Sequence, residues 1–145
     1  MKRYILSLLC LLLLATGAEA QVLQLITDDE ARLPDAQETQ EQVTRAITRG
    51  PGISLASADT VGREEFPLHI VFEPRGGVPI DPKSVRILYL KSPAVDLTER
   101  LKSQIHPDGV EVPAAIAPTG VHPLQVTVRD SKGRQSVKKF KLVVR

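Results

Sequence analysis

The side chains that could carry chemistry are few and form no recognised catalytic motif. The histidines are His69, His106 and His122, and no two of them stand at the spacing of zinc ligands on one element. We interpret His69 as an outward strand residue beside Glu73, and the other two as turn positions before a proline. Cys10 lies in an apolar run, and no serine has the Gly-x-Ser-x-Gly context of a nucleophile. The sequence therefore predicts a non-enzymatic protein with no catalytic residue, metal or cofactor.

The acidic run at residues 28–30 also lacks the arrangement of a cation site. A calcium loop alternates Asp or Asn ligands around a central glycine, and this run does not. Thr27 and Glu30 instead have the spacing of a capping box, in which each side chain satisfies a free backbone donor of the other. This predicts a short helix that Pro34 must interrupt.

Charge is distributed unevenly between the two ends of the chain. Residues 28–41 hold six acidic residues and one arginine, whereas residues 129–145 hold seven basic residues and one aspartate. A possible anion-binding site is formed by basic residues near the end: Lys138, Lys139, Lys141 and Arg145. Such a strip would bind an anionic envelope polymer or dock the acidic segment. The alternative is edge protection, because lysines on an open strand discourage aggregation, and we favour it.

Aromatic side chains are too scarce to form a stacking surface. The chain has no Trp, two Tyr and three Phe, and the strand pattern places most of them inside. Single-stranded nucleic acids and sugars are usually held by rings stacked on exposed aromatics. We therefore expect no nucleic-acid partner, and we expect an unidentified protein partner instead.

The elements that carry the basic residues are predicted to be two antiparallel strands. Their buried side chains occupy alternate positions: Leu124, Val126 and Val128, then Phe140, Leu142 and Val144. Asp130 and Gly133 supply a tight turn between them. Val137 is out of phase with the later apolar set, which predicts a slip or bulge near Lys138 and Lys139.

Upstream strands must cover the apolar face of this hairpin, because an isolated hairpin is marginal in water. Alternating apolar residues predict strands over residues 53–56, 66–73 and 84–91, and a short one near 110–112. Residues 96–105 have apolar positions every four residues, which favours one or two helical turns, with a strand as the alternative. The fold class is therefore all-β, a single immunoglobulin-like β-sandwich of about seven strands. Its core is predicted to contain Phe72, Ile87, Val126 and Phe140.

The first residues have the three parts of a secretory signal peptide. Residues 1–20 contain Lys2 and Arg3, an apolar run and a small-x-small cleavage site, so processing is expected before Gln21. No later stretch is apolar enough for a transmembrane segment. We expect a bacterial protein that is periplasmic or secreted, with no disulfide, because processing removes Cys10.

The processed chain is predicted to divide at a Gly-Pro-Gly sequence. Residues 21–51 are polar and form a leader or linker, and residues 52–145 form the sandwich domain. A second capping-box spacing, Asp35 with Glu38, predicts a helix to about residue 48, with Val43 and Ile47 on one face. The alternative is a disordered leader. In either case we expect the leader to add little stability, because its apolar content is low.

Several motifs in the second half resemble those of known exported domains. They are IDPKSVRILYL at 80–90, VDLTER at 95–100, a Pro-x-Gly-x-His turn at 118–122, and LQVTVRDSKGR at 124–134. This pattern resembles bacterial immunoglobulin-like and fibronectin-III-like domains over residues 52–145, without the paired Cys and core Trp of antibody domains. The resemblance implies an adhesion, spacing or assembly role and supplies no catalytic residue.

Overall fold

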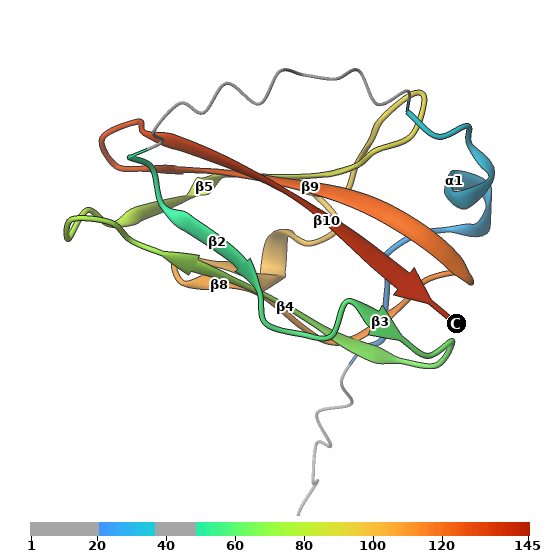
Figure 1. The fold of residues 1–145 in the computed structure, drawn as a ribbon. Coiled ribbons are helices and arrows are strands. Elements are labelled where there is room, and N and C mark those ends of the chain that lie inside the picture. The colour runs from blue at the N-terminus through green and yellow to red at the C-terminus, as the bar shows by residue number, and fades with distance from the viewer. Residues whose placement is uncertain (1–20, 37–48) are drawn as a thin grey trace, which may run out of the picture.

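The computed structural model describes residues 21–36 and 49–145. In these residues two β-sheets pack face to face, and a short helix lies at one end of the sandwich (Figure 1). The predicted all-β sandwich is confirmed. The predicted signal peptide at 1–20 and the predicted helix beyond Ala36 lie outside the described residues.

The first sheet is built around two long antiparallel strands. β4 (Phe66–Glu73) pairs with β8 (Gly109–Ile116) in its middle. Shorter strands complete this sheet: β2 (Gly52–Leu55) beside β4, and both β1 (Leu23–Gln24) and β7 (Ile105–His106) beside β8. β1 runs parallel to β8, whereas the other pairings are antiparallel.

The second sheet contains the predicted hairpin. Its strand order is β3 (Thr60–Val61), β10 (Gln135–Val144), β9 (Gly120–Asp130), β5 (Ile80–Tyr89) and β6 (Val95–Asp96). β3 is parallel to β10, and the other neighbours are antiparallel. The chain thus changes sheets between β2 and β3, so one short stretch borders both layers.

The core lies between the two sheets, where alternate side chains of each long strand meet. β4 shows this clearly, because its buried and exposed residues alternate along most of its length. Phe72, Ile87 and Val126 are buried, as predicted. Phe140 is only partly buried, because it packs at the margin of the core.

The β9–β10 hairpin follows the predicted turn but not the predicted bulge. Gly133 has a φ of 77°, and the Asp130 carboxylate accepts backbone N–H groups of Lys132 and Arg134. Pairing then continues without a shift from Gln135 to Val144, so the expected bulge near Lys138 and Lys139 is wrong. Val137 stays on the outer face and is 49% exposed. Leaving one valine exposed preserves the whole ladder, whereas a bulge would disrupt pairing.

The N-terminal segment belongs to the same core. α1 (Asp28–Arg32) begins with the predicted capping box and ends before Pro34. Leu25 and Ile26, just before it, are 0% and 1% exposed within the sandwich core. Residues 21–36 therefore pack against the sandwich and are not separate from it. The expectation that they add little to stability stays a prediction.

The predicted helical turns after β6 are shorter than the four-residue spacing indicated. Leu97 and Leu101 are fully buried, and the Leu101 N–H donates to the Leu97 carbonyl at 3.2 Å. Only η1 (Lys102–Gln104), one turn of 3-10 helix, follows before β7. The four-residue spacing therefore places Leu97 and Leu101 in the core, but the chain forms no α-helix there.

Candidate functional site

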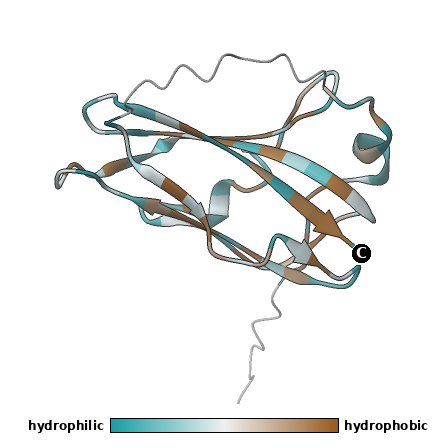
Figure 2. Ribbon diagram, viewed as in Figure 1, coloured by the Kyte–Doolittle hydropathy of each residue, from teal (hydrophilic) through white to brown (hydrophobic). Residues whose placement is uncertain are grey.

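The four predicted anion-binding residues lie along β10, but they do not share one face. Lys138 pairs with Val126, a core residue, so its side chain starts from the inner face. Lys139 and Lys141 alternate with it and start from the outer face. All three lysines are exposed, and none forms an ion pair among the described residues. Figure 2 shows hydrophilic colour along the middle of β10 and hydrophobic colour at its arrowhead.

Arg145 lies apart from these lysines, next to a paired part of the strand. Its backbone N–H donates to the Val61 carbonyl at 3.0 Å, and the Val143 N–H donates to the Asp59 carbonyl at 2.7 Å. β3 therefore covers the outer edge of β10 at this end. The predicted set is thus split into an uncovered lysine stretch and one arginine beside β3.

The bond from Val143 shows which backbone groups point away from β9. In a strand, the N–H and C=O of successive residues point to opposite edges. Because Val143 donates to the segment before β3, the groups of Val137, Lys139 and Lys141 point to the same outer edge. Within the described residues, none of these three has a backbone partner on that edge. We call the stretch from 137 to 141 the open edge.

Two chain segments limit the open edge. At its start, Gly50 approaches so closely that an added Cβ would lie 2.7 Å from the Gln135 carbonyl oxygen. At its far end, β3 pairs with Val143 and Val144. Between them, a hollow of about 530 Å³ borders the strand, lined by Leu55, Ser57, Ala58, Asp59, Lys139, Phe140 and Lys141.

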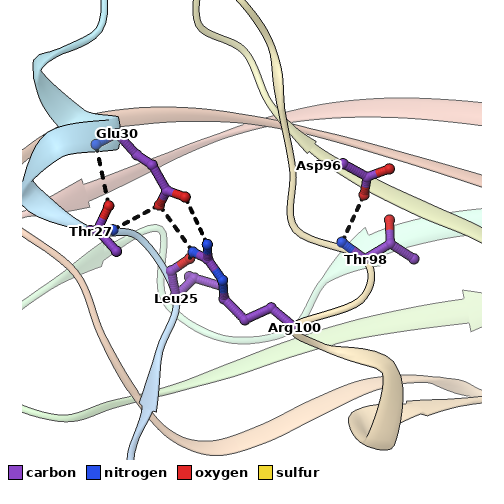
Figure 3. A network of polar contacts seen from close by, with 6 residues as sticks. All are labelled: Leu25, Thr27, Glu30, Asp96, Thr98 and Arg100. Carbon is purple, nitrogen blue, oxygen red and sulfur yellow. Dashed lines mark hydrogen bonds and ion pairs between the residues drawn. The ribbon is translucent and has the colours of Figure 1, made fainter.

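A second polar cluster ties the N-terminal segment to the loop after β6 (Figure 3). The Arg100 guanidinium donates to both carboxylate oxygens of Glu30, at 2.7 and 3.0 Å, and to the Leu25 carbonyl at 2.7 Å. Glu30 also accepts the Thr27 N–H at 2.9 Å, which completes the capping box. The bonds from Arg100, opposed by partial burial, lower the pKa of Glu30 to about 2. Glu30 and Arg100 bond to each other and to nearby backbone, so the cluster fixes the N-terminal segment to the loop after β6.

A third cluster lies inside the sandwich at the end of β5. The Tyr89 hydroxyl is 2.9 Å from His122 Nδ1, and His122 Nε2 is 2.7 Å from the Pro118 carbonyl oxygen. A carbonyl can only accept, so Nε2 carries the proton and Nδ1 accepts from the tyrosine. Burial lowers the pKa of His122 and raises that of Tyr89. Lys91 lies 5.4 Å from the Tyr89 ring centroid and donates to Asp35 at 2.6 Å.

This cluster corrects the interpretation of His122 as a turn residue. His122 is 2% exposed and stands in β9, in phase with the inward Leu124 and Val126. That alternation was visible in the sequence, but the neighbouring Pro123 suggested a turn. His69 is an exposed strand residue, as predicted. His106 is the last residue of β7 and not a turn residue, and it lies exposed immediately before Pro107.

A further hollow, of about 340 Å³, lies over β5, β6 and β9. Its walls mix cations with carboxylates and hydroxyls, from Lys83, Ser84, Val85, Arg86, Asp96, Thr98, Glu99, Thr127 and Arg129. Arg86 pairs with Asp96 at 3.6 Å, and Ser84 accepts the Arg129 N–H at 2.8 Å. The lining carries three cations and two carboxylates, so the hollow has no single sign of charge.

In residues 21–36 and 49–145, no three His, Cys, Asp or Glu side chains gather as a metal site would require. The same residues contain no helix that is long and apolar enough to cross a membrane. No protein-family model and no curated protein matches this chain.

Proposed function

We propose that this chain is a non-enzymatic exported module that acts by binding another protein. The observation that carries the proposal is the open edge of β10, where backbone donors and acceptors face outward beside lysines that have no acidic partner among the described residues. Exposed sheet edges are common sites of protein recognition, because their backbone groups bond readily to another strand.

The strand order supports assigning the sandwich to the immunoglobulin-like type. β2, β4 and β8 follow the order A, B, E of that type, and β10, β9 and β5 follow G, F, C. β1 takes the place beside β8 that strand D has in such domains, and it does so in the parallel direction. Domains of this type serve many functions, so the fold supports a binding role only in combination with the edge.

The arrangement of buried polar groups supports a role without chemistry. Glu30 and Arg100 satisfy each other, and His122 is held between Tyr89 and the Pro118 carbonyl. A general base must reach a substrate proton, and these groups are already committed to neighbours inside the protein. Export remains a proposal from residues 1–20 of the sequence.

The alternative function is binding of an anionic envelope polymer through the same strand. Lys139 and Lys141 begin from one face, which favours it, whereas Lys138 begins from the other face and Arg145 lies apart beside β3. A polymer bound mainly by charge would lose affinity steeply as salt is raised. An added protein strand would keep its backbone bonds.

A photo-cross-linking residue at position 139, in the full chain expressed in its native host, tests the binding role. We expect an adduct of one defined mass at this position and none when the same residue replaces the exposed Lys102, which lies away from β10. Equal labelling at both positions, or none at either, would contradict the proposed function. The N-terminus of the exported form is expected at Gln21, and mass spectrometry of the envelope fraction measures it.

A further inference from the structure

We propose that the open edge of β10 binds an acidic, extended segment of a partner protein as an added β-strand, with its lysines selecting glutamate or aspartate side chains. This inference rests on the proposed function and names the kind of ligand that the edge takes. It is carried by three features of the described residues: the outward backbone groups, the position of the lysines, and the segments that limit the edge.

The backbone supplies the affinity of such a site. Val137, Lys139 and Lys141 direct their N–H and C=O groups outward, and the described residues give them no partner. An added strand would satisfy these groups as the segment before β3 satisfies Val143. The stretch spans about 13 Å at about 3.3 Å per residue, so it fits a short strand.

The lysines supply the selectivity, because they stand on both faces of the strand. Lys139 and Lys141 start from the outer face, and Lys138 starts from the inner face but is still exposed. An extended ligand also alternates its side chains, so acidic groups on either face would meet a lysine. Asp59, at the margin of the hollow, is the one carboxylate among the residues that line it.

The same charges disfavour a second copy of the chain as the occupant. Two β10 edges placed side by side would bring lysines opposite lysines, which destabilises cross-strand pairs. Repulsion of one partner combined with attraction of another is how many binding surfaces become specific. Edge protection and ligand selection are therefore two results of one charge pattern.

The neighbouring segments define where the ligand begins and ends. Gly50 contacts the start of β10 and β3 covers its end, so a bound strand is confined between them. The partly buried Phe140 lines the hollow beside the edge, together with Leu55. An apolar side chain of the ligand can enter this hollow while its acidic neighbours face the lysines.

The test uses the full chain and a synthetic peptide of about eight residues in which glutamate alternates with valine. We expect saturable binding by the parent protein, and no binding of a matched peptide with lysine in place of glutamate. A version with an N-methyl group on every amide keeps its charges but has no N–H to donate to the edge. Its affinity should fall at least about tenfold.

Hydrogen exchange at single amides gives the geometric readout. The glutamate peptide should slow exchange at Val137, Lys139 and Lys141, because their N–H groups become bonded. The amides of Lys138 and Phe140 face β9 and should change little. Uniform protection of the whole strand, or none, would contradict strand addition.

Two substitutions at one position separate the backbone from the charge. Lys139→Gln removes the charge and keeps the N–H, whereas Lys139→Pro removes the same charge and also the outward N–H. The N–H of residue 139 does not bond to β9, so proline leaves that ladder intact. Peptide affinity should be at least about tenfold lower for Lys139→Pro than for Lys139→Gln. The exposed Lys83→Gln is the control with unchanged affinity.

The outcomes distinguish this inference from the proposed function. If the N-methylated peptide binds as well as its parent, or if a sulfated polysaccharide binds and the peptide does not, the site is an electrostatic one for polymers and strand addition is wrong. A peptide that fails to bind, together with a specific cross-link at position 139, overturns the acidic-strand inference and leaves the interaction role standing. The absence of both overturns the two together.

Discussion

The two charged regions of this protein differ in what surrounds their ions. Glu30 and Arg100 lie in a partly enclosed place, with side chains 17% and 30% exposed, and each bonds to the other and to nearby backbone. The lysines of β10 are exposed and, among the described residues, pair with no carboxylate. Removing one partner of an enclosed ion pair lowers stability, because the other charge is left without a partner. Exposed like charges contribute little to stability and remain available to a partner.

The largest expected effect concerns the apolar residues that fix the N-terminal segment beside the enclosed ions. Leu25→Ala should lower the free energy of unfolding by about 2–5 kcal/mol, because Leu25 is fully buried and leaves a cavity. Phe140→Ala, near the open edge, should cost less than the about 3–5 kcal/mol usual for a buried phenylalanine, because Phe140 is only partly buried. Urea unfolding of both variants measures this. Equal stability of Leu25→Ala and the parent would show that residues 21–36 do not belong to the folded core.

The next effect tests the ion pair itself. Arg100→Met keeps the apolar stem but leaves Glu30 and the Leu25 carbonyl without their donor. We expect a loss of about 2–3 kcal/mol, near the lower limit for a buried pair that loses one partner, because this pair is partly solvated. Arg86→Met is the matched control. Its 3.6 Å pair with Asp96 is exposed, so its loss should be below about 1 kcal/mol.

A smaller and graded effect is expected from pH. The pKa of Glu30 is lowered from 4.5 to about 2, so the folded state binds this proton less readily than the unfolded chain. The stability that Glu30 contributes is present above about pH 4.5 and is lost as pH falls toward 2. Glu30→Gln should remove this part of the acid dependence, which thermal unfolding across that range measures. An unchanged profile would contradict the assignment.

His122 gives a separate dependence at higher pH. Burial lowers its pKa below the ordinary value of 6.5, and the positive charge of Lys91 acts in the same direction. Stability from the neutral ring is therefore complete above about pH 6.5 and declines as pH falls through the lowered pKa. NMR titration of the ring should show a midpoint below 6.5. A midpoint above 6.5 would mean that the ring is not buried inside the sandwich.

The smallest effect on stability is expected at the open edge. Replacing Lys139 and Lys141 together with Gln should change the free energy of unfolding by less than about 0.5 kcal/mol, because both are exposed. Self-association should rise, since the charges that separate two such edges are removed. Sedimentation at several concentrations measures it. A stability loss comparable to that of Arg100→Met would end the distinction between the two charged regions.

The confirmed elements are those that a local sequence pattern predicts. Alternation of apolar and polar residues predicted β4 and both strands of the hairpin, and the spacing of Thr27 and Glu30 predicted the cap of α1. The candidate site was found in part, since the sequence indicated the lysines of β10. It could not show that the outer edge beside them is uncovered, because edge exposure depends on which strands become neighbours.

What the sequence determined alone is therefore the buried faces of the long strands and the turn of the β9–β10 hairpin, because a period of two assigns alternate side chains to one side. Only the tertiary structure decided which segments meet. Glu30 and Arg100 are separated by 70 positions, and no local pattern relates them. Residues 21–36 are polar in composition, so the sequence did not indicate that Leu25 and Ile26 are buried. Their burial follows from the pairing of β1 with β8. Long-range contacts such as these form when the two sheets pack together, and the local sequence pattern of one strand does not predict them.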